Sequence, residues 1–196
     1  MCDTGYSVKR LVDDLRELKS LGGPEPAMLE EARERVKRLL LMKHNWLRGY
    51  MCAPSEDSAS VGIYKLHEED DHTLAIFVVT WMPGEETPPH DHRTWAVIAG
   101  LEGHETQHWW KRIDDGSKPG YAEVVRAGHE RVDANVIIAM PSDAIHSLHN
   151  DSGGRSVTLH VYGMNVDYTD RYQYDPVKRT ATPYRFGGRV GSTQAA

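Results

Sequence analysis

Residues 88–105 of the chain read PPHDHRTWAVIAGLEGHE, and two histidines, His90 and His92, stand one residue apart near the start of this stretch. On a β-strand alternate residues face the same side, so an H-x-H pair on a strand directs two imidazoles at one point. Neutral imidazole is the commonest protein ligand for a transition metal. The stretch therefore predicts part of a metal site, beside a strand over residues 92–99.

The composition is that of a folded domain. The chain has 196 residues, 39% hydrophobic and 27% charged, which is enough for one sizeable domain. Its formal net charge of −6 argues against a nucleic-acid partner. The two cysteines, Cys2 and Cys52, give no disulfide framework and favour a reducing cytoplasm. No apolar run has the length of a signal peptide or a membrane span. We therefore expect a small-molecule partner, and homo-oligomerisation stays open.

Two helices are expected in the N-terminal part of the chain. Apolar residues recur every three or four positions in residues 6–21, and again from about Pro26. Ser7 is the expected N-cap of the first helix, and Gly22 is expected to end it. We expect both helices to pack on a larger body.

Short β-rich runs separated by turn residues fill most of the remaining chain. The runs cover residues 61–67, 73–81, 92–99, 104–111, 121–127, 134–140, 144–149 and 156–162. Many short strands of this kind are typical of a β-sandwich or β-barrel. We therefore divide the chain into a helical segment (1–50), a β-barrel (51–175) and a C-terminal tail (176–196). The end of that tail, residues 191–196, is expected to fray.

A third metal ligand is expected from a strand that neighbours the first, and the best candidate is His146, within PSDAIHSLHN. The first block has the pattern G-x5-H-x-H-x3-A-x6-G and begins at Gly84. The second has the pattern P-x-D-x2-H-x3-N and begins at Pro141. Two such blocks, in this order and separated by several strands, indicate a specific kind of site.

These blocks resemble the paired motifs of the cupin superfamily, small β-barrels whose interior holds a metal. The first cupin motif usually has Glu where this chain has Ala96, and the second usually has Gly where it has Asp143. The resemblance implies a mainly β fold, a cupin barrel with the two N-terminal helices packed outside. It also implies metal ligation by His90, His92 and His146.

The absence of a Glu at Ala96 leaves three neutral imidazoles around the metal. Such a site keeps the full charge of a divalent ion and has open positions, which suits an anionic chelating substrate together with dioxygen. A three-His cupin of this kind resembles the thiol dioxygenases of the cysteine dioxygenase family. HDHRTWAVI, GLEGHE and LHVYG resemble its bacterial members, over roughly residues 60–175. The resemblance implies Fe(II) as cofactor, and a small thiol and dioxygen as partners.

Residues 156–162 are expected to form a strand on which Thr158, His160 and Tyr162 share one face and can form a hydrogen-bonded chain. Alone, this pattern favours a buried strand whose polar groups merely bond one another. In thiol dioxygenases, however, a Ser-His-Tyr triad occupies the matching place beside the iron, and Thr158 stands here for the serine. Mammalian-type members carry a cysteine that cross-links to this tyrosine. Because this chain has Ala96 there, no cross-link is expected.

The residue that binds the substrate carboxylate decides the substrate. Cysteine dioxygenases use an arginine on an early strand, near residues 62–64 here, where the sequence has none. Arg171 matches the carboxylate clamp of the 3-mercaptopropionate dioxygenases, and the alternative is an ordinary surface arginine. Tyr64 and Trp95 are further candidates to line the pocket. The resemblance thus favours 3-mercaptopropionate over cysteine or mercaptosuccinate.

Two other classes of protein stay open. One is a cupin isomerase or hydrolase that uses zinc or manganese, although its metal shell usually includes the Glu that is missing at Ala96. The other is a non-catalytic cupin that binds or senses a ligand, for which Tyr162 would have no chemical role.

Overall fold

The computed structural model describes residues 5–55 and 58–185. The expectations for Cys2 and for residues 191–196 fall outside these ranges. Within them, no helix has both the length and the apolar character that crossing a membrane requires.

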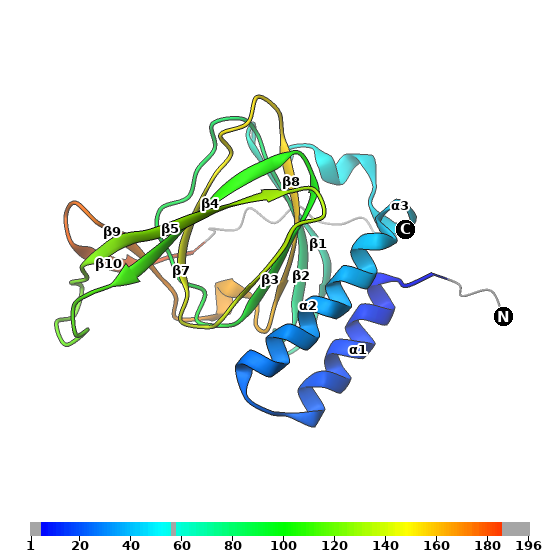
Figure 1. Ribbon diagram of the computed structural model, residues 1–196, viewed down its shortest axis with the longest axis horizontal. Helices are drawn as coiled ribbons and strands as arrows, with labels where there is room; N and C mark the ends of the chain where they lie inside the picture. Colours follow the sequence, from blue (N-terminus) through cyan, green and yellow to red (C-terminus); the bar gives the residue numbers. More distant parts are fainter. Residues whose placement is uncertain (1–4, 56–57, 186–196) are drawn as a thin grey trace.

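Two helices precede the β-strands, as the periodicity predicts: α1 (Val8–Leu21) and α2 (Glu25–Leu41). The Ser7 hydroxyl accepts a hydrogen bond from the backbone N–H of Arg10 at 3.2 Å, which caps α1. Gly22 ends α1 in a backbone conformation with φ of 65°. The two helices lie side by side against one face of the larger sheet (Figure 1). A short helix α3 (Lys43–Trp46) and a 3₁₀ turn η1 (Gly49–Cys52) lead to the first strand.

The described residues contain ten strands in three antiparallel sheets. The strands are β1 (Val61–Glu68), β2 (Ala75–Trp81), β3 (Ala96–Glu102), β4 (His104–Arg112), β5 (Val124–Asp133), β6 (Ile137–Met140), β7 (Ile145–His149), β8 (Ser156–Tyr162), β9 (Tyr172–Asp175) and β10 (Thr180–Pro183). The five-stranded sheet has the order β1-β2-β8-β3-β6, and the three-stranded sheet the order β5-β4-β7. These two sheets face each other across a shared apolar cluster, so the expected mainly β fold with helices outside is confirmed.

The five-stranded sheet has two differently covered faces because its strands alternate. On β8, Val157 and Leu159 pack in the apolar cluster that contains α1 and α2. Thr158, His160 and Tyr162 point to the opposite face, toward the three-stranded sheet. The same alternation places the functional side chains inside and the helix contacts outside.

Two strand predictions need correction. The strand expected over residues 92–99 begins only at Ala96, and His92 lies before it. Arg93 has a left-handed backbone with φ of 56°, which breaks the extended conformation between His92 and β3. The strand expected over 121–127 runs instead from Val124 to Asp133, because its whole length pairs with β4.

The C-terminal part of the described chain is more ordered than a surface tail. Strand β10 lies within the segment expected to be a tail, and it pairs with β9 as a hairpin. Between β8 and β9 lies a 3₁₀ turn, η2 (Val166–Tyr168). The division into a helical segment, a barrel and a tail stays a prediction.

Candidate metal centre

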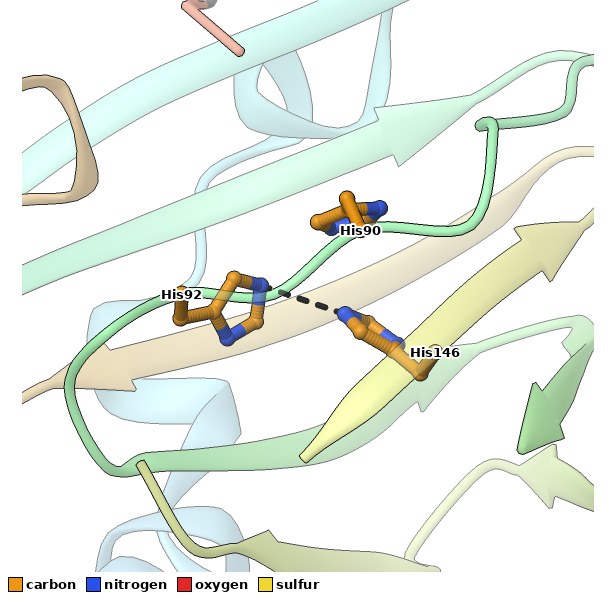
Figure 2. Close-up of side chains that lie close together, drawn as sticks. All are labelled: His90, His92 and His146. Atoms are coloured by element: carbon orange, nitrogen blue, oxygen red, sulfur yellow. Dashed lines mark hydrogen bonds between the residues drawn. The ribbon is translucent and has the colours of Figure 1, made fainter. Parts of the chain in front are cut away.

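Three histidine side chains meet inside the barrel. His90 and His92 lie on the loop before β3, and His146 lies on β7 (Figure 2). Their candidate ligand nitrogens all lie within 4.8 Å of one another, and all three residues are buried. Two backbone hydrogen bonds join His90 to His146, at 2.8 and 2.9 Å, and so hold the loop against β7. The predicted convergence is therefore present, although a loop rather than a strand carries the H-x-H pair.

The hydrogen bonds of two of these histidines fix which nitrogen faces the centre. The Nδ1–H of His90 donates to the carbonyl of Pro88 at 2.9 Å, and the Nδ1–H of His146 donates to Oε1 of Gln107 at 2.7 Å. Because a neutral imidazole carries one proton, each Nε2 keeps its lone pair. The Nε2 atoms of His146 and His92 are 3.1 Å apart. Both nitrogens are thus close enough to serve as ligands of one metal ion.

The protonation of the site suits metal binding. Burial is the main cause that lowers the pKa of all three histidines below the usual value, in the case of His146 to about 3. The charge of Arg171 acts in the same direction on all three, and repulsion by neighbouring histidines adds to it at His90 and His92. The imidazoles are thus neutral at physiological pH, as metal ligands must be. The group contains no carboxylate, and its donor set fits a divalent transition metal such as iron or zinc.

Ala96, the position at which a Glu ligand would stand, pairs directly with Tyr162 across β3 and β8. Its methyl group offers neither a metal ligand nor a sulfur atom beside the phenol. Cys52, the cysteine within the described residues, is buried in the cluster on the helix side of the sheet.

The hydrogen-bonded chain expected on β8 has the predicted geometry. Thr158 Oγ1 lies 2.9 Å from Nε2 of His160, and Nδ1 of His160 lies 2.8 Å from the hydroxyl of Tyr162. The Tyr162 ring stands edge-on to the ring of His92, with centroids 5.1 Å apart. Burial raises the pKa of the Tyr162 phenol, while the nearby charge of Arg171 opposes the rise. The phenol is therefore protonated, and its ring adjoins His92 of the candidate metal centre.

Arg171 is fully buried, so the alternative of a surface arginine is wrong. Its guanidinium carbon lies 4.5 Å from the centre of the Tyr184 ring, and that ring is 5.0 Å from the ring of His90. The carboxylate of Asp167 is 3.7 Å from Arg171. Burial lowers the pKa of Arg171, although an arginine stays charged in proteins. The structure thus places a buried cation beside the candidate metal centre.

Asp91, between the two loop histidines, joins this loop to the hairpin β9-β10. One of its carboxylate oxygens accepts a hydrogen bond from the backbone N–H of Tyr172, and the other accepts one from the hydroxyl of Tyr174, both at 2.7 Å. Arg93 forms an ion pair with the same carboxylate at 2.8 Å. Arg171 directly precedes β9, so Asp91 holds the metal loop and the buried cation in one unit.

A second buried chain of side chains supports His146. Gln107 on β4 accepts the Nδ1–H of His146 and donates its own N–H to Glu105 at 2.8 Å. The other carboxylate oxygen of Glu105 accepts a hydrogen bond from the hydroxyl of Ser156 at 2.8 Å. Burial raises the pKa of Glu105 to about 7, and the hydrogen bonds from Ser156 and Gln107 oppose the rise.

Two residues expected to line the pocket lie elsewhere. Tyr64 faces the helix side of β1, and its hydroxyl donates to the carbonyls of Ala53 and Pro54 at 3.0 and 3.2 Å. Trp95 lines an outer cavity of about 390 Å³ between α1 and the barrel. In both cases the strand or loop turns the side chain away from the interior that contains the histidines.

A small apolar cavity of about 30 Å³ adjoins Tyr162 and His160 inside the barrel. Phe77 and Trp81 of β2 form part of its wall. Trp81 is buried, and its indole N–H has no hydrogen-bond partner among the described residues. Such a donor is available to a polar group of a bound molecule or to a water molecule.

Several of these residues were missed by the sequence analysis. Glu105 and Gln107 alternate with Thr106 and His108 on β4, so a polar face with a period of two was visible in HETQH. Asp91 stands between two predicted ligands and could have been noticed for that reason. No sequence pattern indicated Tyr184, because only the folded hairpin β9-β10 brings its ring next to His90.

Comparison with known proteins gives only distant similarities. No protein-family model matches the chain. An oxalate oxidase in complex with glycolate is 17% identical, with 59% of this chain and 55% of that one covered and a TM-score of 0.41. A protein of unknown function with a cupin-like fold from Ralstonia eutropha is 13% identical, with coverages of 67% and 68% and a TM-score of 0.44. Vicilin from hazelnut, Corylus avellana, is 16% identical, with coverages of 62% and 33% and a TM-score of 0.45.

The chain spans about half the length of the oxalate oxidases that it matches.

Proposed function

We propose that the chain is an Fe(II)-dependent thiol dioxygenase that acts on a small mercapto-carboxylate, with 3-mercaptopropionate favoured. The reaction is RS⁻ + O₂ → RSO₂⁻, in which both oxygen atoms join the sulfur and no external reductant is needed. One observation carries the proposal: a buried arginine and a buried phenol, Arg171 and Tyr162, adjoin three histidines that lack a carboxylate ligand.

The balance of charge supports an anionic substrate. Three neutral imidazoles leave the two positive charges of a divalent ion uncompensated, and Arg171 adds a third beside them. Asp167 offsets part of this charge, but the carboxylate of Asp91 is already paired with Arg93. A substrate with a thiolate and a carboxylate would bring two negative charges into the same space. Buried charges are stable only when they are paired in this way.

Each residue would have a separate task. A ferrous ion held by the three histidines would acidify the thiol and activate dioxygen. Arg171 would bind the substrate carboxylate through two parallel N–H···O hydrogen bonds and so fix its orientation. Tyr162 would hold its phenolic proton close to the reacting atoms, and His160 and Thr158 would hold the phenol in place.

The choice among thiols follows from the charges each one carries. Cysteine has an ammonium group, which would add a further positive charge next to Arg171 and the metal. Mercaptosuccinate has a second carboxylate, which would need a second cation. On β1 the side chain that faces the interior is Ile63. Its apolar side chain can neither pair with the ammonium group of cysteine nor bind a second carboxylate. A simple mercapto-acid with one carboxylate fits these surroundings best.

An oxygen-electrode assay of the iron-loaded protein tests the proposal. We expect oxygen uptake with 3-mercaptopropionate, and slower uptake with cysteine and mercaptosuccinate at equal concentrations. Arg171→Gln should raise the KM for 3-mercaptopropionate by about 10²-fold and leave the iron content unchanged, because a buried charged hydrogen bond is lost.

Other outcomes would overturn the proposal in different ways. A clear preference for cysteine would contradict the role given to Arg171. Zinc or manganese in protein purified without added metal, with no oxygen uptake, would favour an isomerase or hydrolase. Bound iron without uptake for any small thiol would favour a cupin that only binds a ligand.

A further inference from the structure

Glu105 is a buried carboxylate that the proposed reaction does not use. Its side chain has no exposed surface, and the two groups that bond it, the Ser156 hydroxyl and the Gln107 amide, are both neutral. An ionised carboxylate in the interior is costly unless a positive charge lies within reach. Gln107 connects Glu105 to His146, so a metal ion at the candidate metal centre could supply that positive charge.

The direction of every hydrogen bond along this route follows from Glu105. An ionised carboxylate only accepts hydrogen bonds, so the Gln107 amide must direct its N–H at Glu105. Its carbonyl oxygen then faces His146 and accepts from Nδ1–H. With its single proton on Nδ1, the neutral imidazole of His146 has its lone pair on Nε2, the nitrogen closest to His92.

We propose that Glu105 is a positioning residue of the metal centre: through Gln107 it fixes the tautomer of His146 and supplies negative charge that the three imidazole ligands lack. This inference rests on the metal site of the proposed function, and not on the thiol substrate. In other proteins a carboxylate bonded directly to a ligating histidine makes that ligand more basic and orients its ring. Here a glutamine amide stands between the two groups.

Glu105 could also compensate for the absence of a Glu ligand at Ala96. A divalent ion at the histidines would be neutralised in part by a carboxylate that lies outside its ligand shell. The position on the ion that a Glu ligand would occupy would then stay open for substrate.

Metal affinity tests this proposal without any assay of activity. Glu105→Gln keeps the shape of the side chain, because its amide can accept from Gln107 and donate to the Ser156 hydroxyl, but it removes the charge. We expect its affinity for Co²⁺, measured by competition with a chelator, to fall about 10- to 100-fold. The Fe(III)/Fe(II) potential of the iron-loaded variant should become more positive, because a negative charge near the ion is lost.

The matched control is Glu102→Gln, which removes a carboxylate from the same β3-β4 hairpin at the surface, where it pairs with Arg155. It should bind Co²⁺ as the wild type does. Equal affinities for the wild type and Glu105→Gln would overturn the proposal, as would an equal fall in both variants.

A measurement on the wild type settles the matter even if Glu105→Gln does not fold. At a pH above 7, where Glu105 is ionised, the ¹⁵N chemical shifts of the His146 ring in the metal-free protein should show the proton on Nδ1. A proton on Nε2 would overturn the inference.

The failure of this inference is distinguishable from the failure of the proposed function. Wild-type protein that binds Co²⁺ but oxidises no thiol contradicts only the proposed reaction. Unchanged metal affinity in Glu105→Gln contradicts only the role of Glu105.

Discussion

Two buried hydrogen-bonded chains begin two residues apart on β8 and end at different groups. The first starts at Ser156, passes through Glu105 and Gln107 on β4, and ends at His146, a candidate metal ligand. The second starts at Thr158, stays on β8, and ends at the phenol of Tyr162. We call them the Glu105 chain and the His160 chain.

The difference between the chains lies in their charge. The Glu105 chain contains a carboxylate, and its burial is offset only when a cation binds at its far end. The His160 chain has no ionised group, because burial lowers the pKa of His160 to about 3 and raises that of Tyr162. The Glu105 chain is therefore suited to stabilising a bound cation, and the His160 chain is suited to keeping the phenolic proton of Tyr162 in place. The two occupy one interior without sharing a residue.

Removal of one histidine from each chain should separate the two chains most strongly. We expect His146→Ala to abolish metal binding and turnover, since one of three ligands is lost. His160→Ala should retain the metal, because His160 belongs to the other chain. Metal content measured by elemental analysis after gel filtration checks both variants. Loss of metal from both would mean that the chains are not independent.

Tyr162→Phe should lower kcat by about 10²-fold, the lower end of what a positioned proton donor contributes. The metal content should stay at the wild-type level, because the phenol is not a ligand. Stopped-flow oxidation of 3-mercaptopropionate with iron-matched samples measures the effect. An unchanged kcat would remove the His160 chain from the reaction.

The stability of the metal-free protein should depend on pH in opposite ways for the two chains. His160 has a folded pKa of about 3, below its usual value of 6.5, so its contribution to stability is lost as pH falls from about 6.5 toward 3. Glu105 has a folded pKa of about 7, above its usual 4.5, so its contribution is lost as pH rises from about 4.5 to 7. Each slope is up to about 1.4 kcal/mol per pH unit.

Denaturant unfolding at several values between pH 5 and 6.5 checks this opposition. We expect His160→Gln to weaken the loss of stability in acid, and Glu105→Gln to strengthen it. Slopes that change in the same direction in both variants would contradict the assignment of charge.

The smallest effect is expected at the start of the His160 chain. Thr158→Val keeps the shape of the side chain but removes one hydrogen bond of about 1 kcal/mol, so kcat should fall about fivefold. Thr158→Ser should restore the wild-type rate, because the hydroxyl is sufficient. A valine variant with full activity would show that the chain begins at His160.

The same comparison explains what the sequence could predict. The His160 chain lies on one strand, so the alternation of TLHVY was enough to place its three side chains on one face. The Glu105 chain connects β8, β4 and β7, and no local pattern states which strands of a barrel face each other. The mainly β fold and the two outer helices followed from periodicity, which is a local property.

Other expectations failed where the chain is irregular. His90 and His92 were expected on a strand, but they lie on a loop, and the left-handed residue Arg93 separates them from β3. The three histidines do converge as predicted, but strand alternation is not what directs His90 and His92 at one point. Trp95 was expected to line the pocket, yet it lies after that left-handed turn and contacts the outside of the barrel.

Asp91 has a consequence for the order in which the site assembles during synthesis of the chain. The aspartate stands between two ligands, but the groups that hold its carboxylate, the N–H of Tyr172 and the hydroxyl of Tyr174, come 81 and 83 residues later. A nascent chain that has completed all three candidate ligands therefore still lacks the contacts that fix the loop carrying two of them. We therefore expect tight metal binding only after the hairpin β9-β10 has left the ribosome.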